Sequence, residues 1–264
     1  MLMQNKRGLI MGVANSNSIA WGIAEMLSRH GAELAFTYQG EALGKRVRPL
    51  AEGIGARLVL PCDVEDISSV DSLFETLDRE WGSLDFIVHA IGFSDKNELR
   101  GRYADTSRDN FVRTMVISCF SFTEIAKRAA ALMPNGGSMI TLTYGGSVRV
   151  MPNYNVMGVA KAALEASVRY LAADLGPQGI RINALSPGPV RTLAGAGIAD
   201  ARSMFSFQQK HAPLRKSVSL QEIGGSALYF LSDLSGGVTG EVHHIDAGYN
   251  IISMPRREDM EKPE

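Results

Sequence analysis

The chain has 264 residues and a formal net charge of −1, from 27 lysines and arginines against 28 aspartates and glutamates. A near-neutral chain without basic blocks is a poor nucleic-acid binder, because phosphate contacts need clustered positive charge. The two cysteines exclude a disulfide framework and fit a reducing compartment such as the cytoplasm. The five histidines form no metal-ligand pattern, and no apolar run reaches the roughly 18 residues of a membrane span.

Short, unbroken apolar runs recur along the chain and predict strands that are buried on both faces, as in a parallel sheet. The predicted strands are residues 9–13, 34–38, 57–61, 86–91, 139–142, 180–185 and 242–246. Helical windows lie between them, with apolar residues such as Ile19, Ile23 and Leu27 on one face. This alternation predicts a Rossmann-type, doubly wound α/β fold of about seven strands with helices on both faces. No linker divides residues 1–264, so we expect a single domain, ending in a polar tail at 255–264.

The first predicted strand leads into a loop and a helix suited to a pyrophosphate. Gly12 permits the turn, Ser18 is a good N-cap, and Gly22 is expected to let the helix approach the strand closely. The amino end of a helix offers free N–H groups and a partial positive charge. The three-glycine dinucleotide fingerprint is absent, so this segment is a weak signal by itself.

The residues after the second strand predict which nicotinamide nucleotide is used. An acidic residue there would hold the ribose of NAD, whereas a basic residue would hold the extra phosphate of NADP. Gln39 can bind ribose hydroxyls and Glu41 disfavours a phosphate, so we expect NADH, although Lys45 and Arg46 lie further on.

Three later segments border the same edge of the predicted sheet. Asp63 and Val64 end the third strand and could bracket an adenine ring, although Asp63 could instead cap the helix that begins near residue 66. Residues 94–106 and 190–213 follow the fourth and sixth strands, where ligands of such sheets bind. The second stretch is expected to form a lid, with Met204, Phe205 and Phe207 covering an apolar ligand; a surface loop with a short packed helix is the alternative.

Tyr154 and Lys161 are the candidate catalytic pair. They are seven residues apart, which places them on nearly the same face of a helix, roughly 10 Å apart along its axis. A nearby ammonium is expected to lower the pKa of the phenol and to make Tyr154 a proton donor or oxyanion stabiliser. Isolated pairs of this kind are usually structural, but this pair follows a plausible dinucleotide site.

Over essentially its whole length the chain resembles the short-chain dehydrogenase/reductase superfamily, and more closely the NADH-dependent enoyl-acyl-carrier-protein reductases of type II fatty acid synthesis. The matching segments are Gly12 with Ser18-Ile19-Ala20, Tyr38-Gln39, Cys62-Asp63-Val64, His89-Ala90-Ile91-Gly92-Phe93, Tyr154-Asn155-Val156-Met157-Gly158 with Lys161, and Pro189-Val190-Arg191-Thr192-Leu193-Ala194. Ordinary superfamily members carry Tyr and Ser where this chain has Met157 and Tyr144. The displaced phenol suits conjugate reduction, in which hydride adds to C3 of an enoyl thioester while charge gathers on the thioester oxygen.

The resemblance implies roles for individual residues. We expect Tyr154 to donate a hydrogen bond to the enolate oxygen, Lys161 to hold the nicotinamide ribose, and Tyr144 to shape the pocket or assist proton transfer. NADH contacts are implied at Gly12, Ser18, Ile19, Gln39, Asp63, Val64, Ile91, Gly92, Lys161, Val190, Arg191, Thr192, Leu193 and Ala194. Substrate contacts are implied at Ser94, Tyr144 and Tyr154.

The resemblance also implies macromolecular partners. The acyl carrier protein is acidic, and Arg202, Lys210, Arg215 and Lys216 are candidate contacts, although scattered solvated charges would look the same. The family is usually a homotetramer, and residues 236–240 with the last strand match a segment that often lies at its interfaces.

Two other functions compete with this interpretation. The first is a short-chain carbonyl reductase or alcohol dehydrogenase, against which Met157 argues. The second is a non-catalytic dinucleotide-sensing paralogue, against which the intact Tyr154 and Lys161 argue.

Overall fold

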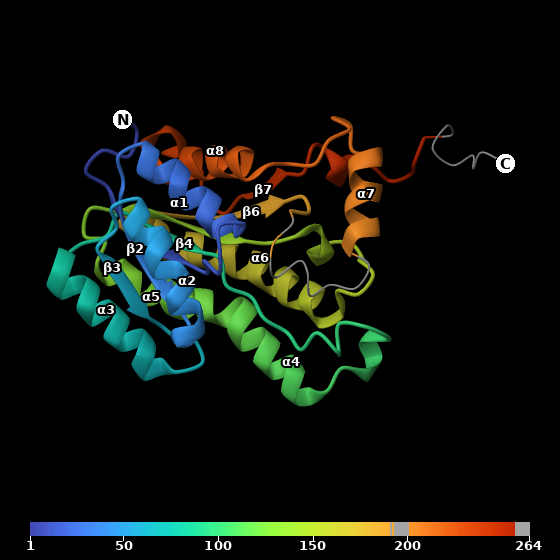
Figure 1. The fold of residues 1–264 in the computed structure, drawn as a ribbon, viewed down its shortest axis with the longest axis horizontal. Helices are drawn as coiled ribbons and strands as arrows, with labels where there is room; N and C mark the ends of the chain where they lie inside the picture. The colour runs from blue at the N-terminus through green and yellow to red at the C-terminus, as the bar shows by residue number, and fades with distance from the viewer. Residues whose placement is uncertain (191, 193–200, 257–264) are drawn as a thin grey trace.

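Seven parallel strands form one sheet in the order β3-β2-β1-β4-β5-β6-β7 (Figure 1). The computed structural model describes residues 1–190, 192 and 201–256, of which 201 and 202 by backbone only. The strands are β1 (Arg7–Met11), β2 (Glu33–Tyr38), β3 (Leu58–Pro61), β4 (Phe86–His89), β5 (Gly137–Leu142), β6 (Ile180–Pro187) and β7 (Val242–Ile245). All seven predicted strands are therefore confirmed, with shifted ends. The chain reverses its direction of winding between β1 and β4, the position at which such sheets open a ligand crevice.

Helices cover both faces of the sheet (Figure 1). On one face α1 (Ile19–Arg29), α2 (Gly40–Gly53) and α8 (Leu220–Leu231) enclose a core that contains Phe36, Phe86 and Phe230. On the other, α3 (Ile67–Trp81), α5 (Ser121–Ala131) and α6 (Asn155–Leu175) pack around Leu73, Phe122 and their neighbours. The helices α4 (Arg108–Met115) and α7 (Ala201–His211) flank these layers, and α7 lies at one end of the molecule. The predicted Rossmann-type doubly wound architecture is confirmed.

One predicted glycine contact is wrong. A Cβ added at Gly22 would lie 2.6 Å from Cβ of Leu220, at the start of α8, and one added at Gly224 would lie 2.9 Å from the Gly22 carbonyl oxygen. Gly22 therefore brings α1 against α8, rather than against the strand as expected. Helix–helix approach and helix–strand approach demand the same small residue, so the sequence pattern cannot distinguish them.

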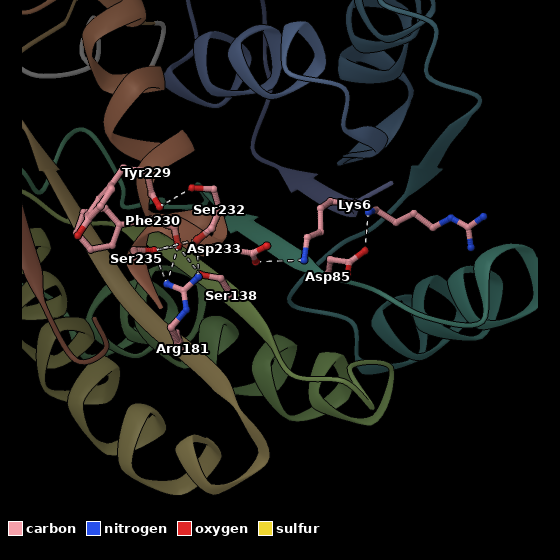
Figure 2. Close-up of polar contacts among 10 residues, drawn as sticks. Lys6, Asp85, Ser138, Arg181, Tyr229, Phe230, Ser232, Asp233 and Ser235 are labelled. Carbon is pink, nitrogen blue, oxygen red and sulfur yellow. Dashed lines mark hydrogen bonds and ion pairs between the residues drawn. The ribbon is translucent and has the colours of Figure 1, made fainter. Parts of the chain in front are cut away.

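A partly buried guanidinium organises the amino-terminal edge of the sheet (Figure 2). Arg181, in β6, donates to the carbonyl oxygens of Phe230 and Ser232 at 2.8 and 3.0 Å and to Oγ of Ser235 at 2.6 Å. Ser138 of β5 donates to the same Phe230 carbonyl at 2.8 Å. These bonds satisfy backbone carbonyl groups at the carboxyl end of α8. The predicted site residues lie at the opposite, carboxyl edge of the sheet.

The helices, the two cysteines and the possible metal ligands of the described residues bear on membrane insertion, redox compartment and metal binding. Among the helices of the described residues, none combines the length and the apolar character needed to cross a bilayer. Cys62 and Cys119 are both free and buried. Within the same residues there is no group of three histidines, cysteines or acids placed to bind a metal ion.

Candidate active site

Two of the cavities at the carboxyl edge of the sheet contain predicted site residues, and the larger of these two has a volume of about 530 Å³. Its lining includes predicted cofactor residues from the ends of β1, β2, β3 and β4, namely Gly12, Gln39, Asp63, Val64, Ile91 and Gly92. Gly12 has φ +97°, and a Cβ there would lie 2.1 Å from the Ala90 carbonyl oxygen. Only glycine fits this turn without strain, and the bare backbone leaves room for a ligand to approach closely.

Ser18 supports the loop below this cavity in a way that differs from its predicted role. It occupies the N-cap position of α1, but its Oγ accepts the N–H groups of Ala14 and Asn15 at 3.0 and 3.1 Å. No side chain caps α1, so the expectation that Ser18 caps the helix is wrong. The hydroxyl stabilises the turn, and the uncapped helix start keeps the N–H character that favours an anion.

Gln39 and Asp63 form one polar unit in the wall of the larger cavity. The Gln39 amide donates to Asp63 Oδ2 at 3.0 Å, and Asp63 Oδ1 accepts the Glu65 N–H at 3.0 Å. The cap of α3 is Asp66, whose side chain accepts the Ser68 N–H, so the alternative role of Asp63 as that cap is wrong. An amide and a carboxylate held together suit the hydroxyl groups of a ribose and the edge of an adenine.

The smaller cavity, about 170 Å³, is largely apolar and contains both candidate phenols. It is lined by Ile19, Thr143, Tyr144, Tyr154, Val190, Thr192, Met204, Phe205 and the segment 187–189. Phe207 does not line this cavity. The residue is 48% exposed, and the centre of its ring lies 4.1 Å from the centre of the His211 ring. The expectation that Phe207 helps to cover the ligand is therefore wrong, whereas Met204 and Phe205 of α7 do face the cavity.

Tyr154 stands immediately before α6 rather than within it. It lies between Asn153 at φ +58° and Asn155 at φ +30°, which are left-handed conformations that asparagine tolerates better than most residues. A Cβ added at Gly146 would lie 2.5 Å from Cδ1 of Tyr154. The turn after β5 thus packs its backbone directly on the Tyr154 ring and holds the ring in place.

The two phenols meet edge to face, with ring centroids 5.2 Å apart and an interplanar angle of 72°. Burial raises the pKa of Tyr154, and Tyr144 and Glu165 raise it further. Burial also raises the pKa of Tyr144 to about 12, although Gln208 opposes this by hydrogen bonding. The expectation that Lys161 lowers the pKa of Tyr154 is therefore wrong, because desolvation of the phenolate dominates. Tyr154 is a neutral hydrogen-bond donor.

Lys161 is buried beside the larger cavity. Its Nζ donates to the Leu142 carbonyl oxygen at 2.9 Å, which leaves two of the three ammonium protons for a ligand. A Cβ added at Gly92 would lie 3.6 Å from Nζ, so the ammonium adjoins a residue that lines that cavity. Burial lowers the pKa of Lys161 to about 8, against the opposing effects of Cys119 and Glu165.

Glu165 is a candidate site residue that the sequence analysis did not identify. Its side chain is buried, and its Oε1 accepts the Thr143 hydroxyl at 2.6 Å. Thr143 immediately precedes Tyr144 and lines the smaller cavity. An acid four residues after Lys161 lies on the same helical face, and that spacing is the signal that could have found it.

His89, at the end of β4, is fully buried. Its Nδ1 lies 3.2 Å from Oγ1 of Thr141, and its Nε2 lies 2.9 Å from Oγ of Ser121. Burial, reinforced by the charge of Lys161, lowers the pKa of His89 to about 3. The ring is therefore neutral at the pH of the cell and joins β4 to β5 and α5.

Ser94 is not in either cavity. Its buried hydroxyl accepts from Thr114 at 2.9 Å and lies 3.3 Å from the Asn110 side chain, and both partners belong to α4. The polar group that was expected to meet substrate is used to anchor the loop 94–106. The structure therefore does not bring Ser94 together with Tyr144 and Tyr154.

Some expected contacts lie outside the described residues. These are Arg191, Leu193 and Ala194, and the side chain of Arg202 is likewise not described. Of the other basic candidates, Lys216 forms an ion pair with Glu222 at the start of α8.

Comparison with known proteins places this geometry in a family. A family model described as enoyl-(acyl carrier protein) reductase matches residues 12–250. The chain is 73% identical to an enoyl-[acyl-carrier-protein] reductase [NADH] of Rhizobium meliloti, over 98% of this chain and 97% of the relative. It is also similar to the crystal structure of FabI from Candidatus Liberibacter asiaticus, at TM-score 0.95 and 62% identity, covering 97% and 99% of the two chains. A reductase of Anaplasma phagocytophilum, solved in complex with NAD, matches at TM-score 0.94 and 57% identity, covering 97% and 98%.

Proposed function

Because the chain belongs to the enoyl-(acyl carrier protein) reductase family, we propose that Tyr154, Lys161 and Tyr144 form its reaction centre. The activity of the chain is NADH-dependent reduction of the carbon–carbon double bond of trans-2-enoyl thioesters on acyl carrier protein, the final reductive step of fatty acid elongation. The observation that supports the residue assignment best is the contact between the buried Tyr154 ring and the partly buried Tyr144 ring in the smaller cavity.

The larger cavity receives the adenosine part of NADH in this proposal. The glycine turn at Gly12 admits the pyrophosphate to the amino end of α1, and the Gln39–Asp63 unit binds the adenosine. Lys161 directs its two remaining ammonium protons to the nicotinamide ribose. Bound NADH supplies the hydride that adds to C3 of the thioester.

Tyr154 stabilises the charge that develops on the thioester oxygen. Its phenol stays protonated because burial raises its pKa, so its hydroxyl donates a hydrogen bond throughout the reaction. A preorganised donor to an oxyanion in a water-poor site contributes about 2.7–4 kcal/mol to the transition state. The enolate is then protonated at C2 by a proton from solvent, which completes the reduction begun by the hydride.

Tyr144 forms the wall that orients Tyr154 and the acyl group. Its edge-to-face contact restricts the Tyr154 ring, and its high pKa keeps a second neutral hydroxyl beside the cavity. Met204 and Phe205 offer apolar surface to the acyl chain. Met157, in the position of the usual superfamily tyrosine, is buried and cannot protonate the carbonyl oxygen of a ketone substrate.

In the predicted lid 190–213 of the single domain, the described residues Met204 and Phe205 cover the substrate, whereas 191 and 193–200, and 257–264 of the predicted tail, lie outside the described residues. The basic residues Lys210, Arg215 and Lys216 lie at the end of α7 or just after it and form the docking face for the acidic carrier protein; the side chain of Arg202, expected there too, lies outside the described part of the chain. The exposed edge of the sheet at β7, with residues 236–240, pairs copies of the chain in a homotetramer. Two free cysteines agree with a cytoplasmic location.

The decisive assay follows NADH absorbance with a 2-enoyl thioester and, in parallel, with a 3-ketoacyl thioester. We expect NADH loss with the enoyl substrate alone. Consumption with only the ketone would favour a carbonyl reductase, and consumption with neither would favour a dinucleotide sensor; either result would contradict the proposal.

A further inference from the structure

Arg48 lies beside Tyr38, a lining residue of the larger cavity, and donates three of its five N–H groups to neighbouring side chains. Nη1 and Nη2 of Arg48 donate to the two carboxylate oxygens of Glu41 at 2.6 and 3.0 Å. Nη2 also donates to the Tyr38 hydroxyl at 2.6 Å, and the guanidinium carbon lies 4.7 Å from the centre of the Tyr38 ring. Tyr38 itself lines the cavity, next to Gln39.

The backbone makes this arrangement possible. A Cβ added at Gly44 would lie 2.9 Å from Cε2 of Tyr38 and 3.1 Å from Nη1 of Arg48. The first turns of α2 therefore pack flat against Tyr38, and the Arg48 side chain reaches back along the helix to its first turn. The side chains of Arg48 and Glu41 are 36% and 61% exposed, so solvent reaches the pair, and it adjoins the rim of the cavity through Tyr38, the lining residue that Arg48 contacts.

This rim is where the two nicotinamide nucleotides differ. In sheets of this type the residues just after the second strand meet the adenosine ribose, and NADP carries a phosphate there. A guanidinium binds phosphate in a bidentate manner, with the same N–H groups that it offers to a carboxylate. In this chain Glu41 and Tyr38 accept from three of the five N–H groups of Arg48, and the Glu41 carboxylate would itself repel a phosphate.

We propose that Glu41 excludes NADPH by holding Arg48, so that the chain contains a latent 2′-phosphate site that is suppressed by one ion pair. The ribose of NADH needs only the Gln39–Asp63 unit and is unaffected by this pair. The inference rests on the proposed placement of adenosine in the larger cavity.

The test compares four variants, Glu41→Ala, Arg48→Met, the double variant and the control Glu52→Ala, an exposed acid at the far end of the same helix. For each, kcat/KM with NADH and with NADPH is measured against one enoyl thioester, and binding of NAD⁺ and NADP⁺ is titrated without substrate. The quantity compared is the ratio of kcat/KM with NADPH to kcat/KM with NADH for the same variant. A partial loss of folded protein lowers both values equally and does not change this ratio.

Glu41→Ala is expected to raise the NADPH:NADH ratio roughly tenfold, since it frees a guanidinium and removes a repelling charge. The double variant should return the ratio to within about twofold of the parent, and Glu52→Ala should leave it unchanged. An unchanged ratio in Glu41→Ala overturns the inference, as does a gain that persists in the double variant, because Arg48 would then be irrelevant. Loss of thioester reduction with intact nucleotide binding would instead contradict the proposed function, and the titrations would still decide the inference.

Discussion

Replacing Tyr154 with phenylalanine removes one oxygen atom and leaves the ring in place. The ring packs against Tyr144 and the backbone at Gly146, and the hydroxyl makes no hydrogen bond to another residue in the described part of the chain. We therefore expect the free energy of unfolding to change by less than about 1 kcal/mol. The substitution should instead reduce the stabilisation of the transition state, and therefore kcat.

The size of that loss follows from the role of the hydroxyl. One preorganised donor to an oxyanion corresponds to about 2.7–4 kcal/mol, or roughly 10²–10³ in kcat. Because burial raises the pKa of Tyr154 above its ordinary value, the phenol of the parent stays protonated, and the defect should be constant across roughly pH 6–9. The affinity for NADH should be nearly unchanged.

The assay is steady-state loss of NADH with a 2-enoyl thioester, together with a thermal melt of each variant. Tyr144→Phe is the matched control, since it removes the hydroxyl of the neighbouring ring and keeps the edge-to-face contact. A fall in kcat of less than about threefold in Tyr154→Phe, or an equal fall in Tyr144→Phe, would refute the assignment of the oxyanion donor to Tyr154.

Three further outcomes are expected. Gly12→Ala should raise the KM for NADH and lower the melting temperature, because it places a Cβ at φ +97° against a carbonyl oxygen; an unchanged titration of NADH would contradict this. Glu165→Gln should move the alkaline limb of the kcat/KM profile to lower pH, because Glu165 raises the pKa of Lys161; a profile identical to that of the parent would show that its charge has no role. Burial lowers the pKa of His89 from 6.5 to about 3, so between these pH values His89 binds a proton in the unfolded chain but not in the folded one. The free energy of unfolding should therefore fall as the pH drops through this range, by up to about 1.4 kcal/mol per pH unit. Urea denaturation from pH 7.5 to 4.5 checks this, and a His89→Gln variant with the same slope as the parent would argue against it.

Much of the fold was predictable from residue pattern alone. Apolar runs located all seven strands, because the five inner strands are buried on both faces and must be apolar throughout, and the edge strands β3 and β7 are partly buried. The strand ends then indicated which residues share one edge of the sheet, and six of the expected cofactor residues line one cavity there. These inferences needed only local sequence and the geometry of a parallel sheet.

The errors arose where the folded conformation decides which groups surround a side chain. The pKa of Tyr154 depends on desolvation by the loops around it, which spacing from Lys161 cannot reveal. The hydroxyls of Ser18 and Ser94 were judged by residue type, but one bonds back to its own loop and the other bonds to α4. Residue type states what a side chain can bond, and only the folded chain determines which partner it meets.

The most direct test of the central claim is a crystal structure of the protein with NAD⁺ and an enoyl thioester analogue. The account predicts that the Tyr154 hydroxyl lies about 2.7–3.1 Å from the thioester oxygen, with Lys161 Nζ on the nicotinamide ribose. A thioester oxygen that is bound by another group, with the Tyr154 hydroxyl turned out of the smaller cavity, would contradict it.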